Sequence, residues 1–306
     1  MYRTLLVPLD GSRFSEHALP LAASIARRAG AALYLVHVHP PRPIGEGVAA
    51  LATEKAAWAQ AKSYLDEVVK RLEAGTGVRA TTRVLDGPVP DTLHECATGQ
   101  IADLVVMSTH GRGPFSRFWL GSVADQLAHR LPMPLLLVRP HEAAVDLARE
   151  PALTRLLVGL DGSPRAEEVL GPALGLARLT GATVALLRVV LPPPVYGMDL
   201  PPYAAAGAGA DLTLLEELRH EADAYLTRVA DRLRGEGHAV EARVAVHTHA
   251  ATALLEEADR TGCDLIALET HGRRGLPRLF LGSVADKVVR GAGVPVLLHR
   301  SLQGAP

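Results

Sequence analysis

A short glycine-containing stretch carries the residue types that bind phosphate. Ser108-Thr109-His110-Gly111 is followed nine residues later by Gly121-Ser122, where a segment with helical spacing begins. A helix that starts at Ser122 leaves its first backbone N–H groups without acceptors, so its N-terminus suits an anion. Glycines lack a Cβ and let the main chain approach that anion closely. The alternative is structural, with Ser122 as an N-cap and the glycines as turn residues.

The same pattern returns 161 positions later in the chain. Thr270-His271-Gly272-Arg273 repeats the turn that contains Gly111, and Leu281-Gly282-Ser283-Val284-Ala285-Asp286 repeats the segment around Gly121. Short glycine patterns match by chance, but one spacing kept in two halves favours the phosphate interpretation. The chain is therefore a tandem duplication. Its 306 residues suffice for two domains, which we expect at 1–142 and 152–301, joined by a linker near 141–152.

Each half alternates apolar, strand-length runs with segments of helical spacing. This alternation predicts an α/β fold of two tandem doubly wound, Rossmann-like parallel five-stranded sheets, each with strand order 3-2-1-4-5. Pro164 suits a first helical position behind Ser163, and Trp58 falls on a helical face that we expect to face the core. The expected strands are 5–9, 32–38, 78–85, 104–107 and 135–138 in the first half, and 156–160, 183–189, 239–246, 265–268 and 296–298 in the second.

Several predicted strand ends converge on one crevice. Ligands of doubly wound sheets bind beyond the carboxyl ends of the strands, and Asp10, Val38 and the loop before Ser122 all follow such ends. The Asp10 carboxylate can accept hydrogen bonds from a ribose or base, and Val38 offers backbone groups and a flat wall to a purine. The alternative for Asp10 is a turn former that caps the first helix. Neither the P-loop pattern nor the dinucleotide fingerprint occurs, which disfavours an ordinary P-loop hydrolase or dehydrogenase.

The composition excludes other classes of function. Lys and Arg number 32 against 33 Asp and Glu, and the basic residues are scattered, so we expect no nucleic-acid partner. Cys96 and Cys263 occupy non-equivalent positions and are interpreted as buried thiols in a reducing compartment. No signal peptide and no membrane-length apolar run is present, which predicts a soluble, cytoplasmic protein. The pairs His37-x-His39 and His247-x-His249 each lack a third ligand, so we expect no metal site.

Three sets of residues resemble the universal stress protein family in its tandem two-domain form. They are Pro8-Leu9-Asp10-Gly11-Ser12, the Thr-His-Gly-Arg turn, and the Leu-Gly-Ser-Val-Ala segment of both halves. Members that bind ATP carry Gly, two residues, Gly, nine residues, then Gly followed by Ser or Thr. The second and third glycines of that motif match in both copies. The first is replaced by Ser108 in one copy and by Glu269 in the other.

The resemblance implies ATP, with Mg²⁺ as an option, as the ligand, and a nucleotide sensor or store as the function. Asp10 and Val38 would face the ribose and adenine. The last strands would pair the two domains within one molecule, with a homodimer of chains as a further option. The implied first site comprises Pro8, Leu9, Asp10, Val38, Met107, Ser108, His110, Gly111, Arg112, Gly121, Ser122, Val123 and Ala124. The implied second, weaker site comprises Gly159, Leu160, Asp161, Val189, Leu268, His271, Gly272, Gly282, Ser283 and Val284.

Glu269 is the reason to expect a weaker second site. A carboxylate about 4 Å from a phosphate charge costs roughly 4 kcal/mol per unit charge at an effective dielectric of about 20. The repulsion would be avoided if the side chain pointed to solvent, held a bridging divalent cation, or were protonated. The second copy also has Gly159 in place of Pro8, and Thr248 in place of Gly87.

Three functions remain open from the sequence. The first is an ATP-binding cytoplasmic stress-response protein with at most slow turnover. The second is a slow ATPase or self-phosphorylating protein, for which Asp10 and His110 are the candidate bases. The third is a ligand-free assembly module in which the repeated loop is structural. His110 and His271 either polarise a phosphate or fix the turn.

Overall fold

The structure, a computed structural model, describes residues 2–40, 48–100, 102–110, 120–192, 205–270 and 281–301. Its first half contains β1 (Thr4–Pro8), η1 (Ser15–Ala18), α1 (Leu19–Ala29), β2 (Ala32–His39), α2 (Val48–Thr76), β3 (Ala80–Asp86), α3 (Val89–Gly99), β4 (Leu104–Ser108), α4 (Ser122–Arg130) and β5 (Leu135–Val138). The second half contains β6 (Arg155–Gly159), η2 (Ala166–Val169), α5 (Leu170–Thr180), β7 (Thr183–Val190), α6 (Ala205–Gly235), β8 (Val240–Val246), α7 (Ala250–Thr261), β9 (Leu265–Glu269), α8 (Ser283–Gly291) and β10 (Val296–His299). The strand bounds lie at most two residues from the predicted ones.

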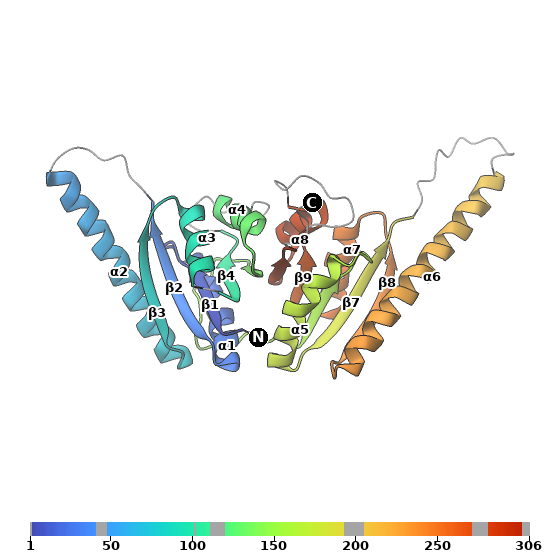
Figure 1. Cartoon of the computed structure of the whole chain (residues 1–306), viewed down its shortest axis with the longest axis horizontal. Helices are drawn as coiled ribbons and strands as arrows, with labels where there is room; N and C mark the ends of the chain where they lie inside the picture. Colours follow the sequence, from blue (N-terminus) through green and yellow to red (C-terminus); the bar gives the residue numbers. More distant parts are fainter. Residues whose placement is uncertain are drawn as a thin grey trace.

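The strands form one continuous sheet in the order β3-β2-β1-β4-β5-β10-β9-β6-β7-β8. Within each half the strands are parallel and follow the predicted order 3-2-1-4-5. The two halves join where β10 runs antiparallel to β5, with Leu297 opposite Leu136. The predicted pairing of the last strands within one molecule is therefore present, and the join lies at the centre of Figure 1.

Helices cover both faces of the sheet because its central strands are apolar on both sides. Leu5 and Val7 of β1 belong to a buried cluster with residues of α1, α2, α5 and α6. Leu6, between them, belongs to a second cluster with residues of α3, α4, α7 and α8. This alternation follows from the two-residue period of a strand. Both clusters contain residues of both halves, so the hydrophobic core continues from one half into the other across the β5–β10 pairing.

Some helical expectations were wrong. The segment after Asp10 first forms the short η1, and in the second half η2 begins at Ala166, so Pro164 is not a first helical residue. Ser163 still acts locally, since its hydroxyl oxygen accepts the Ala166 amide proton at 3.1 Å. Trp58 is 40% exposed, and the N-terminal part of α2 extends beyond the sheet (Figure 1).

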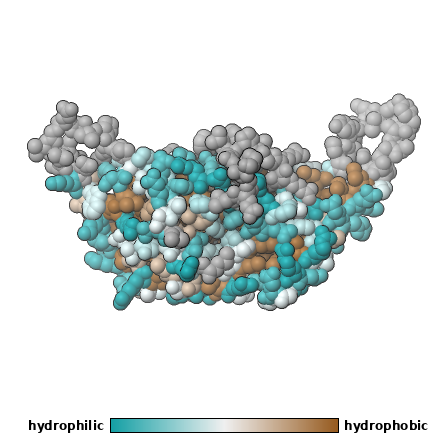
Figure 2. All heavy atoms as spheres, in the orientation of Figure 1, coloured by the Kyte–Doolittle hydropathy of each residue, from teal (hydrophilic) through white to brown (hydrophobic). Residues whose placement is uncertain are grey.

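The segment between β5 and β6, which includes the predicted linker, contains no helix or strand. Glu150 in this segment contacts α1. Its carboxylate forms ion pairs with Arg27 at 2.6 Å and Arg28 at 2.8 Å, and it accepts a hydrogen bond from the Ser24 hydroxyl. Figure 2 shows that hydrophilic residues cover much of one face, with hydrophobic patches near α6. Across the described ranges, no helix is both long and apolar enough to cross a membrane.

Candidate functional site

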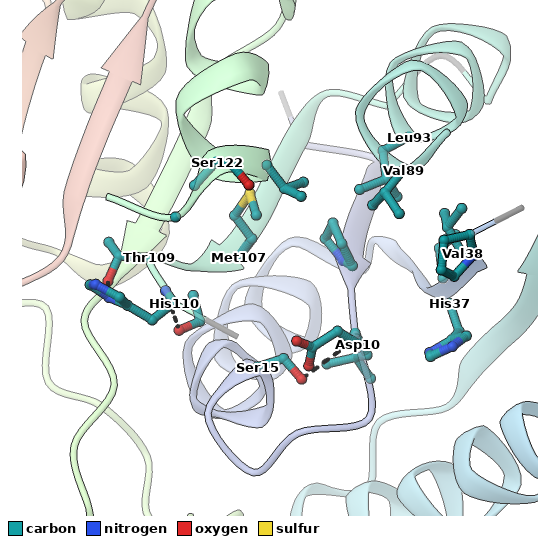
Figure 3. Close-up of a pocket in the computed structure, with 18 of the residues that line it drawn as sticks. Asp10, Ser15, His37, Val38, Val89, Leu93, Met107, Thr109, His110 and Ser122 are labelled. Carbon is teal, nitrogen blue, oxygen red and sulfur yellow. Dashed lines mark hydrogen bonds between the residues drawn. The ribbon is translucent and has the colours of Figure 1, made fainter. Parts of the chain in front are cut away.

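A cavity of about 730 Å³ opens at the carboxyl ends of β1, β2 and β4 in the first half (Figure 3). Every predicted first-site residue that the structure describes lines this cavity, whereas Gly111 and Arg112 lie outside the described residues. The predicted residues that it brings together are Pro8, Leu9, Asp10, Val38, Met107, Ser108, His110, Gly121, Ser122, Val123 and Ala124.

One end of the cavity is apolar. Val38 from β2, Leu93 from α3 and Met107 from β4 are all buried, and Val89 at the start of α3 lies beside them (Figure 3). These side chains come from three elements that the parallel sheet and its covering helix bring together. The result is a slot with apolar walls, of the kind that accepts a flat ring.

The backbone of Val38 gives that slot a polar edge. The pairing of β1 with β2 ends with Pro8 opposite Val36, and the Leu9 amide then donates to the Val36 carbonyl at 2.8 Å. In a parallel strand, every second residue directs both its N–H and its C=O toward the same neighbouring strand. Val36 faces β1, so Val38 is the next residue of β2 whose N–H and C=O point to that side. They lie beyond the end of β1, where a ligand can reach them.

Asp10 lies at the junction of β1 and η1 and holds a tight turn. Its Oδ1 accepts the Ser12 amide at 2.9 Å and the Ser12 hydroxyl at 2.6 Å, and its own amide donates to the Ser15 hydroxyl oxygen at 3.3 Å. Gly11 has a φ of 84°, which glycine adopts without strain. Asp10 therefore forms a turn, and the same residue lines the cavity. The turn fixes the position of the carboxylate before any ligand arrives.

The other end of the cavity is the N-terminus of α4. Gly121 donates its amide to the Thr109 carbonyl at 2.8 Å, and a Cβ on Gly121 would lie only 2.9 Å from that oxygen. A side chain at this position therefore forces the loop to move. No side chain caps the helix at Gly121, and Ser122 is exposed. The first amides of α4 have no acceptor within the helix, so they present a partly positive end to the cavity.

Ser108, Thr109 and His110 line the cavity where β4 ends, and this part is called its floor. Ser108 is buried and its hydroxyl oxygen accepts the His110 amide at 3.3 Å, while the Thr109 hydroxyl lies 2.9 Å from His110 Nδ1 (Figure 3). These contacts support the turn-fixing role of His110. Among the described residues that line the cavity none is a lysine or arginine, so the positive potential that these residues contribute comes from backbone dipoles.

The sequence profile of the universal stress protein family matches residues 1–139 and 153–300 of this chain. The chain belongs to the universal stress protein family. A universal stress protein of Mycobacterium tuberculosis is 29% identical over 310 residues, which cover 97% of this chain and 96% of the relative. One from Thermus aquaticus is 33% identical over 153 residues, covering 45% of this chain and all of the relative. The crystal structure of a universal stress protein from Archaeoglobus fulgidus has a TM-score of 0.70 at 19% identity, covering 97% of this chain and 98% of that one, and supports the fold.

The second universal stress protein domain keeps the turn chemistry of the first. Asp161 Oδ1 accepts the Ser163 amide at 2.8 Å, and Gly282 donates to the Thr270 carbonyl at 2.8 Å. Leu160, Val189, Leu268, Ser283 and Val284 lie at the matching strand ends and helix start, while His271 and Gly272 lie outside the described residues.

Two leucine side chains lie close to the end of β6 in this second domain. A Cβ on Gly159 would lie 2.5 Å from Cδ2 of Leu268 and 3.0 Å from Cδ2 of Leu254. These leucines correspond to Met107 and Leu93, which line the cavity of the first domain. The replacement of Pro8 by Gly159 therefore coincides with side chains that close over the strand end.

Glu269 does not point to solvent, which was the first of the three routes considered for it. Its carboxylate is buried, lies 2.8 Å from His299 Nδ1, and accepts the Ser301 amide at 2.8 Å. The Ser301 hydroxyl in turn donates to Glu168 at 2.8 Å. The side chain therefore points toward the end of β10, and its carboxylate forms hydrogen bonds with protein groups there.

Sequence reasoning missed several residues that line the first-domain cavity. Ser15 lies three residues after the Asp10-Gly11-Ser12 turn, and this short spacing could have identified it. Thr109 and Leu120 are sequence neighbours of residues in the predicted site. Val89 and Leu93 gave no signal beyond that of an ordinary amphipathic helix. The missed residues are Ser15, Val36, His37, Pro40, Val89, Leu93, Thr109 and Leu120.

Proposed function

We propose that the first domain binds ATP in the cavity between Asp10, Val38 and the start of α4. The observation that carries this proposal is the polarity of the cavity, which is apolar at the Val38 end and ends in an uncapped helix N-terminus at Ser122. A nucleotide has the same polarity, with a flat base at one end and phosphates at the other. Asp10 lies at the end of β1 and supplies an acceptor for ribose hydroxyls.

The backbone of Val38 favours adenine among the bases. An N–H donor beside a C=O acceptor pairs with adenine N1 and its 6-amino group. Guanine presents a hydrogen on N1 and an oxygen at C6, so the same edge would place donor against donor and acceptor against acceptor. Each such mismatch leaves a buried polar group without a partner, which costs about 1–3 kcal/mol.

The triphosphate would lie against the first amides of α4. Because no described lining residue is a lysine or arginine, a Mg²⁺ ion that accompanies the nucleotide supplies further positive charge. Gly121 supports this placement, since only the absence of a Cβ lets the main chain at the helix start lie against the Thr109 carbonyl.

We propose a cytoplasmic stress-response protein that senses or stores ATP and turns it over slowly at most. The two candidate bases are already engaged, Asp10 with Ser12 and His110 with Thr109, which disfavours fast proton transfer to either. Release of labelled phosphate at a rate well above that of a variant unable to bind ATP would favour the slow-ATPase alternative. The second domain binds ATP more weakly than the first, because Leu254 and Leu268 close over Gly159.

Calorimetric titration of ATP into the wild-type chain and the Ser122→Asp variant tests the proposal. Ser122 is exposed, and an aspartate in the first turn stabilises a helix, so the variant should fold at least as stably as the wild type. Its carboxylate would nevertheless repel the phosphates, and we expect affinity to fall about tenfold or more. The matched control, Ser283→Asp in the second domain, should leave affinity at the strong site unchanged. Absence of saturable binding by the wild type, or equal affinity of Ser122→Asp, would overturn the proposal.

A further inference from the structure

Each domain donates an arginine to the C-terminal end of the other domain's last helix. Arg300, which follows β10, donates from Nη1 to the carbonyl of His129 near the end of α4. Arg139, which follows β5, donates to the carbonyls of Ala292 at 3.0 Å and Arg290 at 3.5 Å at the end of α8. His129 and Arg290 are equivalent in the repeat, as are Arg300 and Arg139, so the two contacts cross the β5–β10 join in a nearly symmetric way.

The two helices bury similar residues along one side. Both have nine residues, and the buried residues of α4 are Ala124, Leu127 and Ala128, while those of α8 are Ala285, Val288 and Val289. These sets bury similar apolar area, so packing along one side does not distinguish the two helices. Contacts at the ends help to fix the position of each helix.

The end contacts of α4 come from both domains. Within the first domain, Arg130 forms an ion pair of 2.5 Å with Asp91 of α3. From the second domain, the guanidinium of Arg300 reaches the His129 carbonyl. A cation at this end also opposes the partial negative charge of the helix C-terminus. The opposite end of the same short helix presents Ser122, Val123 and Ala124 to the cavity.

We propose that Arg300 is a positioning residue for the nucleotide site of the first domain. By holding the C-terminal end of α4, it fixes where the amides at the other end lie relative to Gly121 and the floor of the cavity. The second domain thereby controls the affinity of the first domain through one side chain. This inference rests on the proposed function, because it assigns a determinant of ATP affinity at the same site.

The test compares ATP affinity and unfolding free energy in Arg300→Ala, Arg300→Lys and Arg139→Ala of the full chain. Arg139→Ala is the matched control, because it removes the equivalent contact from α8. We expect Arg300→Ala to weaken ATP binding about three- to thirtyfold. Arg300→Lys keeps a charged donor and should recover part of that loss. Arg139→Ala should leave the ATP affinity within about twofold even though it removes a comparable hydrogen bond, a contrast that a merely structural role would not produce.

Hydrogen exchange supplies a second readout, since amides at 122–130 should exchange faster in Arg300→Ala than in Arg139→Ala. Wild-type affinity in Arg300→Ala, or equal losses in Arg300→Ala and Arg139→Ala, would overturn the inference. If the wild-type chain shows no saturable ATP binding, the proposed function and this inference fall together. If it binds ATP and Ser122→Asp does not, while Arg300→Ala binds normally, only the inference falls.

Discussion

The carboxylate of Glu269 lies 2.8 Å from Nδ1 of His299, across the β9–β10 pairing that sets these two residues opposite each other. In the first domain the equivalent positions hold Ser108 and Val138, and Ser108 lines the cavity. The acidic residue that departs from the family's glycine motif is thus part of the structure of the second domain. It belongs to a polar cluster with Ser301 and Glu168 at the end of the last strand.

Replacing Glu269 should not create a second strong nucleotide site. In Glu269→Ser the carboxylate is gone, but Leu254 and Leu268 still close over Gly159. We expect calorimetry to give one strong ATP site per chain, as for the wild type. His299 and the Ser301 amide lose their acceptor, so the unfolding free energy should fall by about 1–3 kcal/mol. A stoichiometry of two strong sites would show that charge alone had weakened the second site.

Asp10 and its repeat equivalent Asp161 should differ in their effect on ATP binding. Asp10→Asn keeps an acceptor oxygen for Ser12 but removes the charge that strengthens hydrogen bonds to ribose hydroxyls. We expect its ATP affinity to fall about three- to tenfold. Asp161→Asn, in the second domain, should leave the affinity of the strong site unchanged. Equal behaviour of the two variants in the same titration would contradict a ribose contact at Asp10.

Base selectivity tests the backbone edge of Val38 without any substitution. Two mismatched hydrogen bonds should make GTP bind about a hundredfold or more weakly than ATP. Inosine triphosphate presents the same mismatched edge as GTP without its 2-amino group, so it should also bind weakly and exclude a simple size effect. Competition against a fluorescent adenine nucleotide measures all three. GTP affinity within about threefold of ATP would place the base elsewhere in the cavity.

The linker contact at Glu150 should give a defined acid dependence of stability. Hydrogen bonds from Arg27, Ser24 and Arg28 lower the pKa of Glu150 to about 2. A carboxyl group with a lowered pKa in the folded state stabilises that state above its unfolded pKa, about 4.5, and loses this contribution as pH falls toward 2.

The partly exposed Glu150 pair is screened by solvent, so its contribution should be modest. Glu150→Gln should lower the unfolding free energy by about 1 kcal/mol at pH 7. Denaturant titrations at a series of pH values should show the difference between wild type and variant shrinking below the unfolded pKa. A difference that stays constant down to pH 2 would mean that Glu150 stabilises through packing alone.

The fold could be predicted because its determinants are local and are repeated. Residues such as Leu5 and Leu6 lie on a strand that is buried on both faces, which produces a continuous apolar run. The duplication presents each strand twice at a constant spacing. Trp58 was misassigned because helical periodicity says which residues share a face, and only the tertiary structure decides whether that face has a neighbour.

The candidate site could be predicted only where it follows strand ends or glycine turns. Asp10, Val38 and Gly121 were accessible for this reason. Leu93 was not, because its place over the cavity depends on how α3 packs across the sheet. Glu269 posed the same difficulty, since its partner His299 is 30 residues away and becomes a neighbour only through the β9–β10 register.

The antiparallel join between β5 and β10 also gives a physical reason for the two domains to belong to one chain. The joining strands Leu135–Val138 and Val296–His299 are nearly interchangeable, so detached halves would form like pairs as readily as unlike ones. The linker holds unlike strands together at a high effective concentration. Every molecule then contains one domain of each kind, a composition that a mixture of free subunits would not maintain.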